Sequence, residues 1–216
     1  MIRIIVLAFA FFAGPVHSAA LLVTGTVTRF DLSETGVGEF AVGQAFSLVY
    51  QYAPGAIDVA SDGHIGDYRN SISDSSLSIG GYSLSSQGGN INVVDDGFGS
   101  TFDRYSLLIA AWNATLLSPS VSGLFPYAIE VQLDDPTGNA LTSDSLPAGP
   151  WDATQFVDRT FILAFASSIT PDVAFGVKRV YGHVDSISFI PEPSTLLLFG
   201  VALVMCVMQV KRRRSV

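Results

Sequence analysis

The sequence contains little that could cross-link the chain or hold a transition metal. Among its 216 residues there is one cysteine, Cys206, and there are three histidines. A single thiol cannot close an intramolecular disulfide, and it cannot provide a cysteine-ligated metal centre. A chain of this length can bury a core that is stable without such links. We therefore expect the hydrophobic core alone to stabilise the fold.

The familiar catalytic signatures are also missing. The sequence has no Gly-x-Ser-x-Gly elbow, no His-Glu-x-x-His pair and no Walker loop. His17 lies in a segment that we expect to be removed, so only His64 and His183 could act in the exported protein. Glycoside hydrolysis needs two carboxylates across a cleft, which neighbouring aspartates in a turn do not supply. We predict that the protein is not an enzyme, with a polysaccharide hydrolase as one alternative.

Charged residues are scarce, at 14% of the sequence, and the basic ones concentrate at the two ends. Residues 21–190 contain 6 Lys or Arg and 18 Asp or Glu, which gives this region a formal charge of about −12. Such a charge disfavours nucleic acid and anionic lipid as partners. It favours solubility, cation binding or contact with neutral sugars.

The first 20 residues have the pattern of a secretory signal peptide. Arg3 precedes an apolar stretch, and small residues follow as far as Ala20. We expect signal peptidase to cleave this segment, so that the mature chain begins at Ala19 or Leu21. An uncleaved helical anchor is the alternative. This segment and the opposite end of the chain both point to export.

The last 26 residues combine three features in a fixed order. Pro191-Glu192-Pro193 favours an extended chain, because proline fixes φ and restricts the residue before it. Residues 194–210 carry no charge and would form about 26 Å of helix, the short end of a membrane span. Residues 211–216 begin with the cations Lys211, Arg212, Arg213 and Arg214. These should stay on the cytoplasmic side, with everything before Pro191 outside.

This arrangement resembles the PEP-CTERM sorting signal of Gram-negative bacteria. The resemblance implies that the membrane-bound transpeptidase exosortase recognises Pro191, Glu192 and Pro193. It also implies that residues 194–210 form a transient inner-membrane anchor and that the cations from Lys211 to Arg214 act as a stop. The mature protein would then reach the cell surface or the exopolysaccharide matrix. A plain C-terminal anchor without processing is the alternative.

The region between the two ends is predicted to be all-β. Phe46, Leu48, Tyr50 and Tyr52 alternate with the period of a strand, and Gly80-Gly81 suggests a hairpin or a bulged strand pair. Short strands separated by turn residues favour a β-sandwich or jelly roll over residues 21–190, with a closed barrel as the alternative. The strands are expected at residues 21–30, 46–52, 77–84, 90–94, 105–112, 127–133, 156–166 and 184–190.

Three aspartate-rich loops are candidates for calcium, because hard cations bind several oxygens from flexible turns. They are residues 58–68, residues 95–99 and residues 134–139, and the first also contains His64. Asp95-Asp96 and Asp134-Asp135 would form a site only if their strands end at the same edge of the fold. The competing interpretation is that all three are ordinary turns. We expect no resident cofactor, with Ca²⁺ as the alternative.

Exposed aromatic residues could form a platform on which sugar rings stack, although most rings fill the core in such folds. Trp151, in a Pro- and Gly-containing loop, is the best candidate for ligand contact. Asn113-Ala114-Thr115 matches a glycosylation acceptor, which we interpret as a chance match in a bacterial protein. The candidates for the platform are Trp112, Trp151, Tyr52, Tyr68, Tyr82 and Tyr127.

These features predict a non-enzymatic exported protein of the cell surface or biofilm matrix, associated with exopolysaccharide. Signal peptidase and exosortase are the expected processing partners. A calcium-dependent carbohydrate-binding module is the second interpretation.

Overall fold

The computed structural model describes residues 19–31, 40–53, 55–97, 101–147, 152–170 and 173–190. In this part of the chain the regular structure is β-strand, apart from the single 3₁₀ turn η3 (Ala153–Gln155). The predicted all-β class is therefore confirmed.

Eleven of the strands form one sheet with the order β3-β6-β7-β9-β10-β13-β1-β2-β4-β5-β8, and every pairing in it is antiparallel. Strands β11 and β12 pair separately. The strands are β1 (Ala19–Phe30), β2 (Ala45–Tyr52), β3 (Ile65–Tyr68), β4 (Ile72–Ile79), β5 (Tyr82–Gly88), β6 (Asn90–Val94), β7 (Asp103–Ala110), β8 (Ala114–Leu117), β9 (Phe125–Asp135), β10 (Asp158–Ala166), β11 (Ser168–Thr170), β12 (Val173–Phe175) and β13 (Lys178–Ile190).

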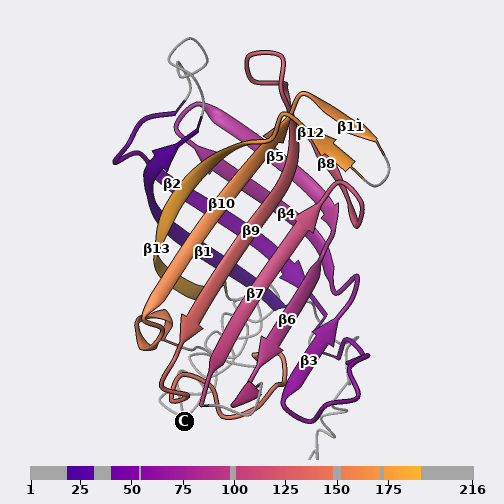
Figure 1. Ribbon diagram of the computed structural model, residues 1–216, viewed down its shortest axis with the longest axis vertical. Helices are drawn as coiled ribbons and strands as arrows, with labels where there is room; N and C mark the ends of the chain where they lie inside the picture. Colours follow the sequence, from indigo (N-terminus) through magenta and orange to yellow (C-terminus); the bar gives the residue numbers. More distant parts are fainter. Residues whose placement is uncertain are drawn as a thin grey trace, which may run out of the picture.

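The large sheet curls so that its two halves face each other. Figure 1 shows β6, β7, β9 and β10 crossing in front of β2, β4 and β5. Strands β13 and β1 lie in the middle of the strand order and join the halves. The two facing layers agree with the expected sandwich-like arrangement, but they belong to one continuous sheet. Among the described strands, β3 and β8 are the two edges of this sheet.

Side chains that alternate along the strands fill the space between the halves. In β1 the residues Leu21, Val23 and Val27 are buried and alternate with more exposed ones. The same alternation in β2 buries Tyr50 and Tyr52, as the period of two predicts. The main core therefore lies between the two facing halves of one sheet.

Contacts across this core join strands that are far apart in the sheet. The rings of Phe46 (β2) and Phe161 (β10) stack with their centroids 4.1 Å apart. The hydroxyl groups of Tyr50 (β2) and Tyr105 (β7) lie 2.7 Å apart and share a hydrogen bond. These strands are not neighbours in the sheet, so the contacts hold one half against the other.

Two glycines make room for this arrangement at the joining strands. A Cβ atom on Gly25 (β1) would lie 2.5 Å from Phe46 Cζ, and one on Gly182 (β13) would lie 2.8 Å from Phe46 Cε1. The ring of Phe46 thus lies directly against the backbone of the joining strands. The β1–β13 pairing is also irregular between Thr24 and Gly25, where the register shifts. Such irregularities increase local twist and bend a strand, which accounts for the curl.

The hairpin predicted at Gly80-Gly81 is confirmed. Ile79 pairs with Tyr82 across a two-residue turn, and Gly80 has a φ of 55°, which glycine adopts at little cost. The predicted strand start at Phe156 is two residues early, because Phe156 caps η3 and β10 begins at Asp158.

In the described residues no helix is long and apolar enough to span a membrane. The helix predicted at residues 194–210 lies outside these residues.

Replacing Gly182 with alanine should destabilise the protein by about 1–3 kcal/mol, the usual cost of overpacking a filled core. The new Cβ would lie 2.8 Å from the Phe46 ring and 2.9 Å from the carbonyl oxygen of Thr26. Gly81→Ala is the matched control, because nothing lies within 4 Å of a Cβ at that position. Urea unfolding of both variants measures the difference. Equal stabilities would contradict the proposed role of Gly182 in the curl.

Candidate functional site

The strands next to the two terminal segments pair with each other. Ala20 of β1 is the partner of Ile190 of β13, and Leu21 is the partner of Phe189. The predicted signal peptide and sorting segment therefore join the described chain on adjacent strands. Pro191, Glu192, Pro193 and the cations Lys211, Arg212, Arg213 and Arg214 lie outside the described residues.

Two of the aspartate-rich turns do come together at one end of the sheet. Strands β6 and β9 flank β7, so that Asp95 and Asp96 follow β6 on one side and Asp135 ends β9 on the other. Asp103, the first residue of β7, pairs directly with Asp135. A Cβ atom on Gly138 would lie 2.6 Å from Asp96 Oδ1, so the two turns are in contact.

The buried carboxylates at this end are already engaged by the protein's own backbone. Asp103 is fully buried, and it accepts hydrogen bonds from the N–H groups of Asp96 (3.1 Å) and Leu141 (2.8 Å). Asp135 is also buried and accepts from the N–H groups of Thr137 (3.0 Å) and Asn139 (2.9 Å). Their oxygens fix the shape of the turns, which is the role that the turn interpretation assigns to them.

These contacts shift the pKa values of two carboxyl groups in opposite directions. Burial acts to raise the pKa of Asp135, but hydrogen bonds from Asn139, Thr137 and Ala140 outweigh it and lower the pKa. Burial, followed by the nearby carboxylates of Asp103 and Asp96, raises the pKa of Asp95.

The neighbouring Asp134 is held by an ion pair. Arg104 donates to both of its oxygens, at 2.7 Å from Nε and 3.1 Å from a terminal nitrogen. This bidentate contact engages the Asp134 carboxylate on the outer face of the sheet. The hydrogen bond to Asp134 is the main cause of the raised pKa of Arg104.

The loop predicted at residues 58–68 is shorter than expected, because residues 65–68 form β3 and pair with β6. Its aspartates behave in the same way. Asp58 Oδ1 accepts from the N–H groups of Ala60 (2.9 Å) and Asp67 (2.8 Å), and Asp62 accepts from the N–H of His64 (3.0 Å). The ring of His64 lies 3.0 Å from the carbonyl oxygen of Asp95, not beside another imidazole. His183 lies on β13, paired with Thr26 and Thr160. The histidines therefore share no site.

The described residues contain no group of three or more His, Cys, Asp or Glu side chains arranged to hold a metal ion. The acidic turns converge, and the carboxylates of Asp58, Asp62 and Asp135 accept from nearby N–H groups. The turn interpretation accounts for these contacts at residues 58–68 and 134–139.

Three of the six aromatic residues proposed for the platform lie in the core. Tyr52, Tyr68 and Tyr82 are 0%, 6% and 3% exposed. Tyr52 donates to the carbonyl oxygen of Pro147, and burial raises its pKa to about 12. Trp112 is 55% exposed, and its ring lies 5.4 Å from that of Tyr127 at the surface. Trp151 lies outside the described residues.

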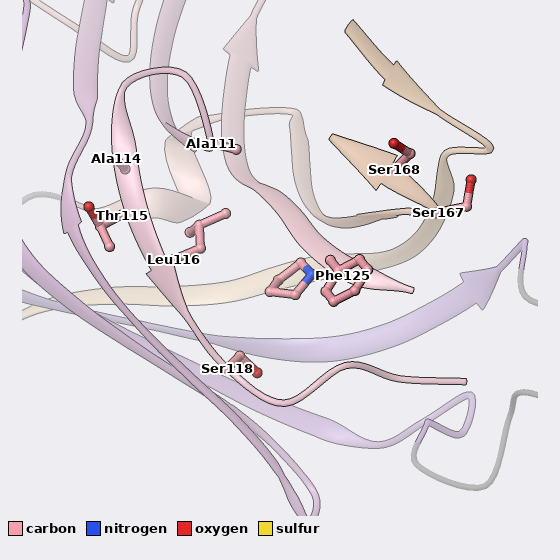
Figure 2. Close-up of a pocket in the computed structure, with 9 residues that line it drawn as sticks. Ala111, Ala114, Thr115, Leu116, Ser118, Phe125, Ser167 and Ser168 are labelled. Atoms are coloured by element: carbon pink, nitrogen blue, oxygen red, sulfur yellow. The ribbon is translucent and has the colours of Figure 1, made fainter. Parts of the chain in front are cut away.

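An open pocket of about 640 Å³ lies beside the turn that contains Trp112, and its lining includes Ala111 and Ala114 on either side of that turn. Figure 2 shows its wall on β8, with Thr115 and Leu116, opposite Ser167 and Ser168, and with Phe125 between the two sides. The lining residues are Ala111, Ala114, Thr115, Leu116, Ser118, Phe125, Pro126, Ser167 and Ser168.

Sequence reasoning did not identify this pocket. Its walls come from β8 and its flanking residues, from the start of β9 and from the segment that follows β10. β9 and β10 are paired neighbours, but β8 lies at the other end of the strand order and comes near them because the sheet curls. The one feature in the sequence that pointed to this region was Trp112, a candidate for the aromatic platform. The adjacent Asn113-Ala114-Thr115 triplet was interpreted only as a chance glycosylation acceptor.

Comparison with known protein families identifies the terminal segment. Residues 189–214 match the family model of the PEP-CTERM protein-sorting motif, so the predicted resemblance is confirmed. The motif implies an exported, surface-sorted protein that exosortase processes. The searches of curated proteins and of solved structures returned no match.

Asp135→Asn should destabilise the protein at neutral pH by about 2–4 kcal/mol, because buried hydrogen bonds to a charged group contribute about 1.5–3 kcal/mol each. The folded-state pKa of Asp135 is lowered, so its contribution is complete at pH values above the unfolded pKa. It is lost as the pH falls through the folded pKa. Denaturant unfolding at pH 7, 5, 4 and 3 should show the difference shrinking below about pH 4.

Asp62→Asn is the control, because Asp62 is exposed and accepts one hydrogen bond from the neighbouring turn. Its effect should be small at every pH. If the loss of stability caused by Asp135→Asn stays constant down to pH 3, the lowered pKa of Asp135 is not its cause, and the assignment is wrong.

Proposed function

We propose that the protein is a surface or matrix protein without catalytic activity, exported through its first 20 residues and released from the inner membrane by exosortase. The observation that carries the proposal is the sorting motif at residues 189–214. It overlaps the end of β13 at Ile190, so the proposed recognition tripeptide from Pro191 to Pro193 follows the folded domain directly.

The pairing of β1 with β13 supports a common attachment side for both processed segments. Ala20 pairs with Ile190, so cleavage by signal peptidase and by exosortase would occur at the same end of the paired strands β1 and β13. Only Pro191, Glu192 and Pro193 separate β13 from the proposed helix at residues 194–210. Three extended residues span about 10 Å, which holds the domain close to the membrane until it is released.

The same strands favour Ala19 as the first residue of the mature chain. Ala19 pairs with Tyr52, and Ala20 pairs with both Gln51 and Ile190. Cleavage before Ala19 would keep these pairs, whereas cleavage before Leu21 would remove them.

The contacts of the acidic residues support a non-catalytic domain. A hydrolase of polysaccharides needs two carboxylates that face a common cleft. The pocket, by contrast, is lined by alanine, leucine, phenylalanine, proline, serine and threonine side chains. The buried Asp103 and Asp135 hold turns at the edge of the sheet. These uses of the carboxylates also support a protein without a resident calcium ion.

Replacing Pro191 and Pro193 with alanine together should leave the protein in the inner-membrane fraction at its unprocessed C-terminal mass. The two substitutions remove the rigid extended peptide that the proposed recognition requires. Cell fractionation and the intact mass of the protein measure the outcome. The wild-type mass should match a chain that begins at Ala19 and has lost residues 194–216.

Pro119→Ala, in a loop after β8, is the matched control and should be released normally. Release of the double variant at the wild-type rate would refute the sorting mechanism.

A further inference from the structure

The pocket lies where the curled sheet remains open. β8 is an edge strand that pairs with β5 on one side only. Its other side faces the start of β9 and the segment that follows β10, across the pocket. This side of β8 is therefore not paired with any other described strand, and the space beside it is open.

The lining carries no charged side chain, although the domain around it is strongly acidic. Residues 21–190 have a formal charge of about −12, while the nine lining residues are all neutral. An anionic ligand would meet repulsion from the domain without a cation to offset it, and a cation would find no carboxylate in the pocket. The chemistry of the lining therefore selects a neutral ligand.

Three exposed hydrophobic side chains lie at or beside the pocket. Eight large hydrophobic side chains are more than a third exposed in the described residues, and Trp112 and Phe125 are the aromatic ones among them. Phe125 lines the pocket at 52% exposure, and Trp112 lies in the turn between the lining residues Ala111 and Ala114. Leu117, 59% exposed, ends the same edge strand.

Hydroxyl groups complete the lining. Ser118 donates to Tyr82 (2.8 Å), so its hydroxyl is fixed by the fold. Thr115 and Ser168 are exposed at the pocket, and no hydrogen bond within the described chain engages their hydroxyls. Figure 2 places these two residues on opposite sides, with Phe125 between them.

We propose that this pocket binds a neutral saccharide, with a sugar ring against Phe125 and Trp112 and with its hydroxyls bonded by Thr115 and Ser168. Sugars combine an apolar C–H face with neutral hydroxyl groups that donate and accept hydrogen bonds. The volume of about 640 Å³ lies within the ordinary range for small-molecule sites. The inference deepens the proposed function. It rests on that function for the location of the protein, which is delivered to a polysaccharide layer.

An added peptide strand would use the same edge less well. β8 has four residues, so few backbone hydrogen bonds would form with a partner strand. A second copy of the chain would also bring together two domains of about −12 each. Saccharide binding uses the hydroxyls and both aromatic rings, which strand addition leaves unexplained.

The test uses the processed protein purified from the culture medium, titrated calorimetrically with cellohexaose, maltohexaose, mannohexaose and oligogalacturonate. We expect binding to at least one neutral oligosaccharide, with and without EDTA, and no binding to the anionic one. Phe125→Ala and Trp112→Ala should each weaken binding by about tenfold, equivalent to the loss of one ring contact. Thr115→Val, which keeps the side-chain shape, should weaken it several-fold.

Ile57→Ala is the control, because Ile57 is 80% exposed and lies outside the pocket. It should bind like the wild type, and thermal unfolding of all variants confirms that they fold. Failure to bind any neutral probe, or equal binding by the Phe125 and Trp112 variants, would overturn the proposal. Dimerisation that these variants abolish, without saccharide binding, would overturn it in favour of strand addition.

The two proposals fail separately. A protein that is released normally but binds no saccharide refutes the pocket assignment and leaves the sorting mechanism intact. Normal release of the Pro191/Pro193 double variant refutes the sorting mechanism whatever the pocket binds.

Discussion

The stack of Phe46 on Phe161 is the contact on which the architecture depends. A sheet of eleven strands can bury one face only by folding over itself or by packing against another layer. Here it folds over itself, and Phe46 reaches across from β2 to β10 over the bare backbone of Gly25 and Gly182. A side chain at either glycine would occupy the space of the ring. The curl of the sheet and the packing of its core therefore depend on the same contact.

The distribution of charge follows from this geometry. At one end of the sheet, the turns after β6 and β9 are adjacent because both strands flank β7, and aspartates hold those turns by accepting backbone N–H groups. At the open seam beside β8, the chain uses serine, threonine and apolar residues instead. A domain of about −12 thus contains one neutral, partly aromatic surface. That contrast is stronger evidence for a binding surface than the pocket shape alone.

Local patterns predicted the strands well and the arrangement of the sheet poorly. The alternation of residues 46–52 and the Gly80-Gly81 turn are encoded by neighbouring residues, and both match the structure. Strands β3, β8, β11 and β12 were missed, because three or four residues are too few for a period of two to stand out. The sequence predicted two facing layers but not that one continuous sheet supplies both, because the bend in β1 and β13 depends on the fit of Phe46 over two glycines. No local pattern reports a contact of that kind.

The sorting motif and the pocket differ in the same way. The motif is one continuous peptide, so its residues could be predicted from order and composition, and the family match at residues 189–214 agrees. The pocket needs residues 111–118, 125–126 and 167–168 together, which only the folded sheet provides. The two features also lie apart in the fold. The pocket wall at Ser167 follows β10, whose residue Phe165 pairs with Lys178 at the start of β13. Ile190 ends β13 twelve residues later, about 40 Å along the strand at about 3.3 Å per residue. Under the proposed attachment at Ile190, the neutral surface and the membrane therefore adjoin different parts of the domain, and a ligand could reach the pocket before release as well as after it.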